Sequence, residues 1–150
     1  MEIITKLTDI IFWLNISATD MIAPNLHKGQ LVILESTTYP GTTKNLLRPL
    51  LEAQGRTIDE DFLLAFSPER IDPGNKRFNI RNTPKVVGGE SEKSGDAAAA
   101  FYRRFVSEIH LTRGTKEAEA AKLLENTYRH VNIALVNELT MFCHDLEIDI

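Results

Sequence analysis

The chain has 150 residues, which is enough for one domain with a hydrophobic core of its own. Its net charge of -4 and its pI of about 5.6 argue against a non-specific nucleic-acid binder and provide no basic anchor for an anionic membrane. The single cysteine, Cys143, excludes an intrachain disulfide and favours a reducing compartment, so we expect a cytoplasmic protein.

Short apolar runs alternate with helical patterns along most of the chain. Strands are predicted at residues 31–35, 62–66, 85–87 and 109–112, and helices at residues 42–53, at 91–106 and from 115 almost to the end. Asp72-Pro73-Gly74-Asn75 predicts a turn between the second and third strands. This order predicts an α/β fold with about four parallel strands covered by helices, which is half of a doubly wound sheet.

The last predicted helix stands out by its length and by its two apolar faces. It runs for about 33 residues, or about 50 Å. Apolar residues recur at spacings of three and four from Ala121 to Leu146, and a second set, which includes Leu123 and Ile133, forms another apolar face. A helix that is apolar on two sides is normally buried by a partner, so we expect self-association through this helix.

A hydroxyl-rich segment follows the first predicted strand. Ser36, Thr37 and Thr38 lie where a parallel strand ends and a helix begins, which is the usual ligand edge of such sheets. Backbone N–H groups at the helix start can hold an anion or a water molecule, and the hydroxyls can reach a cofactor amide. The alternative is a plain strand–helix turn with Thr42 as its N-cap, which is the commoner use of this pattern.

A second polar segment, Ser67-Pro68-Glu69-Arg70, follows the next strand and is expected at the same edge of the sheet. Glu69 is a candidate general base that acts on a water molecule. The alternative is a surface turn in which Glu69 or Asp72 forms a salt bridge with Arg70.

A third segment lies on the long helix. Lys122 and Asn126 are four residues apart and therefore share one helix face, where an ammonium and a carboxamide can bind a sugar hydroxyl and stabilise an alkoxide. The alternative is a solvated face on which Lys122 pairs with Glu119 or Glu125.

Taken together, these segments resemble one family. The resemblance rests on Thr-Thr-Tyr-Pro-Gly-Thr at 37–42, Ser-Pro-Glu-Arg at 67–70, Lys-Leu-Leu-Glu-Asn at 122–126, Asn-Thr-Pro-Lys-Val-Val-Gly-Gly at 82–89 and Asn-Glu-Leu at 137–139. The chain resembles the UDP-glucose/GDP-mannose dehydrogenase family, and within it the branch that oxidises UDP-N-acetylglucosamine or UDP-N-acetylmannosamine to uronic acids. The resemblance covers about residues 17–150 and leaves residues 1–16 unassigned.

The resemblance implies the C-terminal half of a Rossmann-like NAD-binding domain over residues 17–114 and a central helix that forms a dimer over residues 115–150. It also implies that NAD accepts hydride from C6 of a UDP-sugar. The residues that would contact NAD are Ser36, Thr37 and Thr38, with Thr37 also orienting a water molecule. Glu69 would be the base for thioester hydrolysis, and Lys122 and Asn126 would steady the oxyanions. The residues expected to bind substrate are Glu69, Arg70, Ile71, Asp72, Lys122 and Asn126.

Two segments of the family pattern do not occur in this sequence. These are the Gly-x-Gly-x-x-Gly turn that cradles the pyrophosphate of NAD and the Gly-Gly-x-Cys stretch with the nucleophilic cysteine. Cys143 lies within the predicted helix and is not expected to replace that cysteine. We therefore expect an interior fragment of a dehydrogenase that shows no turnover alone.

Two other interpretations remain open. The wider hydroxyacid-dehydrogenase group also uses a Lys-x-x-x-Asn pair on a helix, although the segment at 67–70 argues against it. A non-catalytic interaction module that docks through the long helix belongs to a different class of protein. The four histidines show no metal-site spacing, so no metal is expected.

Overall fold

The computed structural model describes residues 13–70 and 79–150. Residues 13–22 are helical, and the elements that follow are η1 (Ala23–Asn25), β1 (Gln30–Leu34), η2 (Thr43–Leu47), α2 (Arg48–Glu52), β2 (Phe62–Phe66), β3 (Lys85–Gly89), α3 (Glu92–Tyr102), β4 (Ile109–Leu111) and α4 (Thr115–Asp145). All seven predicted strands and helices are confirmed, whereas the predicted turn at 72–75 lies outside the described residues. Within the described ranges, no helix has both the length and the apolar character needed to cross a membrane.

The four strands form one sheet in the order β1-β2-β3-β4. β1 pairs with β2 in parallel and β3 pairs with β4 in parallel, which confirms the α/β class. The expectation of four parallel strands is wrong for the central pair, because β2 and β3 are antiparallel, with Ala65 opposite Gly89. The physical reason is the connection: a parallel pair needs a long crossover, usually a helix, and residues 67–84 have three prolines and no helical periodicity.

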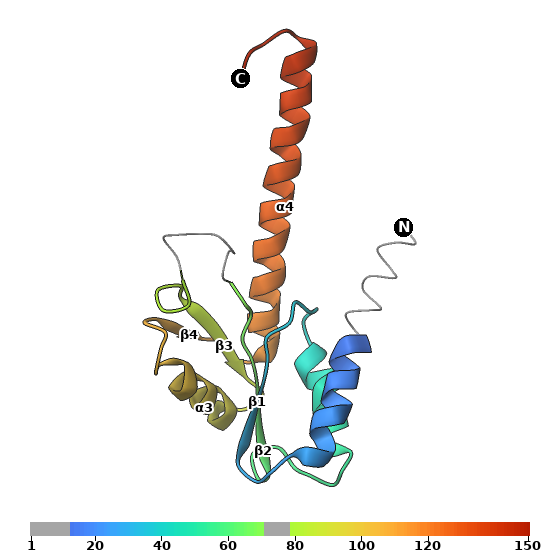
Figure 1. Ribbon diagram of the computed structural model, residues 1–150, viewed down its shortest axis with the longest axis vertical. Helices are drawn as coiled ribbons and strands as arrows, with labels where there is room; N and C mark the ends of the chain where they lie inside the picture. Colours follow the sequence, from blue (N-terminus) through green and yellow to red (C-terminus); the bar gives the residue numbers. More distant parts are fainter. Residues whose placement is uncertain (1–12, 71–78) are drawn as a thin grey trace.

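Helices cover both faces of the sheet (Figure 1), with α3 on one face and α2 and residues 13–22 on the other. Each face has its own cluster of buried side chains. The first contains Ala23, Leu26, Leu51, Ile58, Phe62 and Leu64, and the second contains Ala65, Val87, Ala98, Tyr102 and Val106. Neighbouring residues of β2, such as Leu64 and Ala65, belong to opposite clusters because successive strand side chains point to opposite faces.

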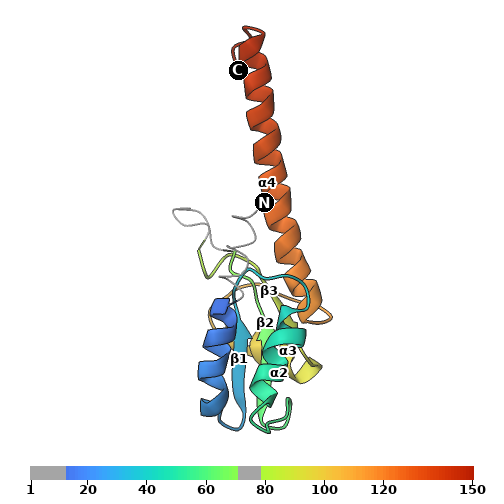
Figure 2. The ribbon, with the colours of Figure 1, turned by 90° about the vertical axis from the view of Figure 1, so that its right-hand side faces the viewer.

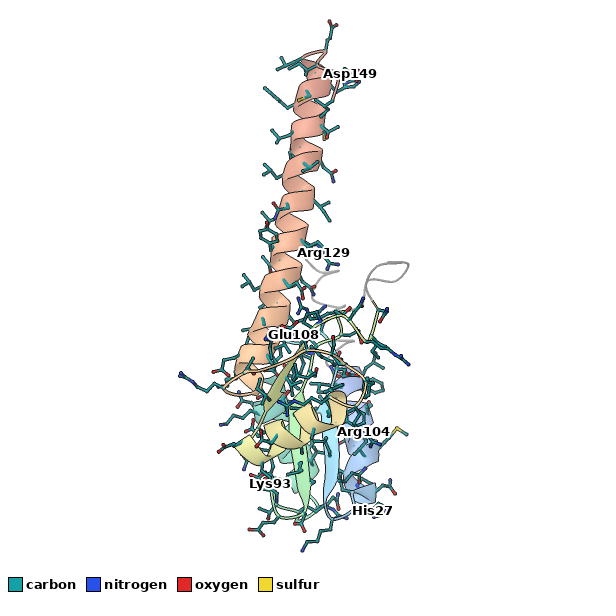
Figure 3. All side chains as sticks on the ribbon, turned by 90° about the vertical axis from the view of Figure 1, so that its left-hand side faces the viewer. His27, Lys93, Arg104, Glu108, Arg129 and Asp149 are labelled. Carbon is teal, nitrogen blue, oxygen red and sulfur yellow. The ribbon has the colours of Figure 1, made fainter. Side chains whose placement is uncertain are left out.

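The long helix α4 projects from this body like a rod (Figure 1). Its buried residues, Thr115, Ala118 and Glu119, all lie in the first two turns. Between residues 127 and 150 every side chain is exposed except the partly exposed Cys143. Figure 3 shows side chains radiating from the helix on all sides from about Arg129 upward. The apolar faces that the sequence predicts are therefore open on this chain.

Candidate active site at the carboxyl edge of β1 and β2

The polar segments after β1 and β2 leave the sheet at the same edge. The parallel register places Leu34 beside Phe66, and the Ser67 N–H donates to the Leu34 carbonyl over 3.0 Å. The Ser67 hydroxyl is buried and donates to the Val86 carbonyl over 2.8 Å, which anchors the start of the second segment to β3. The prediction that both segments lie at one edge is confirmed.

Helix α4 reaches this edge through two polar contacts. Lys122 Nζ donates to the Glu69 carbonyl oxygen over 2.6 Å. Arg70 Nη2 lies 3.0 Å from Glu125 Oε1, and Arg70 Nη1 donates to the Pro84 carbonyl over 3.2 Å. Glu125 therefore pairs with Arg70 from another segment, rather than with Lys122 on its own helix. The Lys122–Glu69 pair and the Arg70–Glu125 pair each join positions more than 50 apart in the sequence.

An open groove of about 380 Å³ lies between α4 and the end of β2. Its lining residues are Pro68, Arg70, Val86, Ala121, Lys122, Leu124, Glu125 and Tyr128. Lys122 provides positive charge, Arg70 is paired with Glu125 across the groove, and Leu124 and Tyr128 provide an apolar wall. Such a mixture suits a ligand that combines a ring with an anionic group. Asn126, partly buried, lies one turn beyond Lys122 on the same helix face.

The segment after β1 arches toward the first turns of α4 (Figure 2). Thr37 is exposed, whereas Ser36 and Thr38 are partly buried. Among the described residues, Thr38 Oγ1 is the buried side-chain oxygen or nitrogen that lacks a hydrogen-bond partner. Because buried polar atoms are nearly always bonded, this oxygen is an exception within the part of the chain that the structure describes.

The start of the helix after this segment was expected either to be capped by Thr42 or to offer its N–H groups to an external anion, and at residues 41–43 it does neither. The Thr42 hydroxyl donates to the Tyr39 carbonyl over 2.7 Å, so it does not cap the helix. The N–H groups of Gly41 and Thr43 are not free for an external anion, because the buried Glu119 carboxylate accepts from both. The helix start therefore binds an anion of the chain itself.

A second polar cluster lies directly beside this edge. Glu35 pairs with Lys85 Nζ at 2.7 Å and accepts a hydrogen bond of 2.6 Å from the Tyr102 hydroxyl. Burial alone raises the pKa of the Glu35 carboxyl, but the hydrogen bonds from Lys85 and Tyr102 outweigh it and lower that pKa below 4.5. Burial, followed by the hydrogen bond to Glu35, raises the pKa of Tyr102 far above its usual value. The cluster fixes the end of β1 against β3 and α3.

The structure thus brings Glu69, Arg70 and Lys122 together and places Thr37 and Thr38 at the same edge. Ile71 and Asp72 lie outside the described residues. Cys143 is 21 positions beyond Lys122 on α4, about 32 Å along the helix axis. A nucleophile at that distance cannot reach a substrate held by Lys122.

Two buried charged contacts, those of Glu119 and of Lys85, do not follow from the sequence patterns. The only local signal for Glu119 is its place in Ala118-Glu119-Ala120-Ala121, where a lone acid stands among alanines in the part of α4 that contacts the sheet. Lys85 opens an apolar strand, a position at which a lysine usually points to solvent.

Comparison with known proteins identifies the family. Residues 7–106 match the NAD binding domain of the UDP-glucose/GDP-mannose dehydrogenase family, and residues 116–150 match its central domain. The chain belongs to this family. The match to the NAD binding domain begins at residue 7, before the stretch on which the sequence resemblance rests.

Curated relatives with similar sequences oxidise UDP-N-acetyl sugars, as their names state. The chain is 40% identical to a UDP-N-acetyl-D-glucosamine 6-dehydrogenase of Pseudomonas aeruginosa over 136 residues, which is 89% of this chain and 32% of the relative. It is 41% identical to a UDP-N-acetyl-D-mannosamine dehydrogenase of Pyrococcus horikoshii over 130 residues, which is 86% of this chain and 31% of the relative. The chain spans about a third of the length of these relatives.

Solved structures agree with the fold. The native UDP-N-acetyl-mannosamine dehydrogenase of Staphylococcus aureus superposes with a TM-score of 0.80 at 42% identity, covering 89% of this chain and 32% of the other. A GDP-mannose dehydrogenase of Pseudomonas aeruginosa, at 21% identity, superposes with a TM-score of 0.75 over 94% of this chain and 32% of its own; this likeness concerns the fold alone.

Proposed function

We propose that this chain supplies part of the active site of an NAD-dependent dehydrogenase that oxidises the C6 alcohol of a UDP-N-acetylhexosamine to a uronic acid for polysaccharide biosynthesis. The observation that carries the proposal is the 2.6 Å hydrogen bond from Lys122 to the Glu69 carbonyl, which brings α4 to the ligand edge of the sheet. In this proposal, the NAD-binding domain extends to residue 114 and residues 115–150 are the central helix; the domain begins at residue 7, where the family match starts, rather than at residue 17 as the sequence suggested. The single cysteine suits a cytoplasmic location.

The segment after β1 fits an NAD cofactor. In the described ranges 13–70 and 79–150, Thr38 Oγ1 is buried without a hydrogen-bond partner, and a hydroxyl can donate to or accept from a carboxamide. Ser36 and Thr37 would contact the same ligand. Bound NAD would supply the hydride acceptor. The exposed hydroxyl of Thr37 would hold a water molecule beside it.

Lys122 and Asn126 are proposed to bind the oxygen atom that gains negative charge during the oxidation. An ammonium has three donors, so Lys122 can bind a substrate oxygen and keep its bond to the Glu69 carbonyl. The Glu69 carboxylate accepts a hydrogen bond of 2.7 Å from the Arg70 N–H and is the group that would deprotonate a water molecule. Arg70 borders the groove and would contact the substrate, as would Ile71 and Asp72 of the neighbouring segment.

Ligand titration of the purified chain tests the proposal. We expect UDP-N-acetylglucosamine or UDP-N-acetylmannosamine to bind, and Lys122→Ala to weaken that binding about tenfold or more because it removes a charged hydrogen-bond donor. Lys116→Ala is the matched control, because Lys116 is an exposed lysine on the same helix. If neither NAD nor a UDP-sugar binds, the proposal fails and a docking role through α4 is favoured. The same samples, followed by NADH absorbance, test the expectation that the chain alone shows no turnover.

We also propose that α4 packs against a second copy of this chain. Beyond the groove, a stripe of exposed apolar residues follows the helix at spacings of three and four: Val131, Leu135, Leu139, Phe142 and Leu146. Side chains of this kind contribute about 1.5–3 kcal/mol each when fully buried, so pairing two such stripes is strongly favourable. A two-fold axis across α4 would bring the same stripe from both copies together.

Light scattering at several concentrations tests the pairing of α4. Leu135→Lys places a charge in the middle of the stripe and should shift the chain toward monomer, because burying an unpaired charge is costly. Asn137→Lys adds the same charge to the second apolar face, four residues from Ile133 and from Met141, and should leave the association unchanged because the stripe forms the contact. A wild-type chain that stays monomeric at all concentrations would refute the proposal.

A further inference from the structure

Glu119 is a fully buried carboxylate to which the proposed chemistry gives no role. Its Oε1 accepts hydrogen bonds from the Thr43 N–H, at 2.8 Å, and from the Thr43 hydroxyl, at 2.7 Å. Its Oε2 accepts from the Gly41 N–H. A buried charge is tolerated only when it is well bonded, and these three donors come from one short segment that lies 76–78 positions away in the sequence.

The bonded segment is the one that carries the candidate cofactor residues. Gly41 has a φ of +101°, a conformation that side chains other than glycine rarely adopt, so the turn before η2 has a specific shape. The hydroxyl of Thr42 turns back to the Tyr39 carbonyl rather than stabilising η2. The turn is held from within by the bonds to the Tyr39 carbonyl, and from outside the segment by the carboxylate of α4.

Glu119 also lies one turn before Lys122 on the same helix. A single rigid helix thus presents Glu119 to the segment after β1 and Lys122 to the segment after β2. We propose that Glu119 is a positioning residue: its carboxylate ties residues 36–43 to α4 and so fixes where Thr37 and Thr38 stand relative to Lys122. The consequence for cofactor binding rests on the proposed function, whereas the tie itself does not.

Amide hydrogen exchange, measured by NMR on the full chain, tests the tie. Glu119→Gln keeps the side-chain shape but replaces one acceptor oxygen with a donor, which leaves an N–H of Gly41 or Thr43 facing another N–H. We expect exchange at these two amides to become about tenfold faster or more, while the core amides of β2 keep their protection. Glu117→Gln is the matched control, because Glu117 is exposed on the same helix.

Thr43→Val supplies a second variant that removes only the hydroxyl donor, in case Glu119→Gln does not fold. It should accelerate exchange at the Thr43 and Gly41 amides in the same way but by less. The proposal is overturned if exchange in residues 36–43 is unchanged in both variants. It is also overturned if exchange rises equally in β2, because Glu119 then contributes only to global stability.

The effect on cofactor binding is measured by titrating NAD into the wild-type chain and both glutamine variants. We expect Glu119→Gln to raise the dissociation constant about tenfold and Glu117→Gln to leave it unchanged, because a displaced segment no longer presents Thr37 and Thr38 together. Equal affinity in Glu119→Gln and the wild type would overturn the positioning role. If NAD does not bind even the wild-type chain, the proposed function fails, and the exchange data still decide whether Glu119 ties the segment to α4.

Discussion

Replacing Gly88 by alanine places a methyl group where β3 meets the start of α4. An added Cβ would lie 2.3 Å from the carbonyl oxygen of Gly114, the N-cap residue of α4, and 2.8 Å from Thr112 Oγ1. Carbon and oxygen atoms that are not bonded normally approach to about 3.3 Å. The start of α4 must therefore move away from β3 by about 1 Å.

We expect this displacement to cost stability and to disturb the site. Forced overpacking costs about 1–3 kcal/mol, and the upper end applies because a backbone atom cannot rotate away as a side chain can. At about 2–4 °C per kcal/mol for a chain of this size, the melting temperature should fall by roughly 6–12 °C. Lys122 moves with α4, so ligand affinity at the Glu69 edge should fall as well. Circular dichroism melting and the UDP-sugar titration measure the two effects.

Gly95→Ala is a matched control in the neighbouring helix α3. An added Cβ there would meet Gly89 N at 3.5 Å and Leu111 Cδ2 at 3.7 Å, which are ordinary packing distances. Because alanine is favoured over glycine inside a helix by about 0.5–1 kcal/mol, we expect a slightly higher melting temperature. The reasoning is refuted if Gly88→Ala melts at or above the wild-type temperature, or if Gly95→Ala is the less stable of the two.

Three further predictions concern stability, each measured by urea unfolding. Glu35→Gln should be less stable than the wild type near neutral pH and should lose that disadvantage well below pH 4.5. Because folding lowers the pKa of Glu35, its carboxylate stabilises the fold above the pKa of the unfolded chain, and this stabilisation is lost as the pH falls through the lowered pKa; a pH-independent difference would contradict this. Ser91→Ala should cost about 1 kcal/mol, because the Ser91 side chain caps α3 by accepting from the Ser94 N–H over 3.0 Å; an unchanged midpoint would count against the cap. Leu64→Ala should cost about 2–5 kcal/mol, because Leu64 is fully buried; a loss below 1 kcal/mol would mean that the core relaxes around the gap.

The strongest local patterns were predictable to within a residue or two. β2 spans residues 62–66 as its apolar run predicts, and α4 begins at Thr115 as predicted. The helix predicted at 42–53 is present, but it begins as the short π-helical segment η2 and only then becomes α2. A propensity pattern cannot distinguish these forms, because they differ in the spacing of their backbone hydrogen bonds and not in the residue types they prefer.

The candidate site was predictable in part. The presence of Glu69 and Lys122 in one site followed from family resemblance, and the parallel pair β1 and β2 made the common edge predictable from the sequence. The partners of the charged side chains were not predictable. Neighbours at three and four residues on the helix suggested that Lys122 pairs with Glu119 or Glu125, whereas those two carboxylates bind Thr43 and Arg70.

By itself, the sequence determined which segments are strands and helices, the continuous apolar run of β2 and the two apolar faces of α4. These features depend on neighbours within a few positions, whose spacing decides which side chains share a face. Only the tertiary structure decided that β3 runs antiparallel to β2 and that Glu119 ties the segment after β1 to α4. Such contacts join residues up to 78 positions apart, and their energy depends on burial that no local pattern encodes.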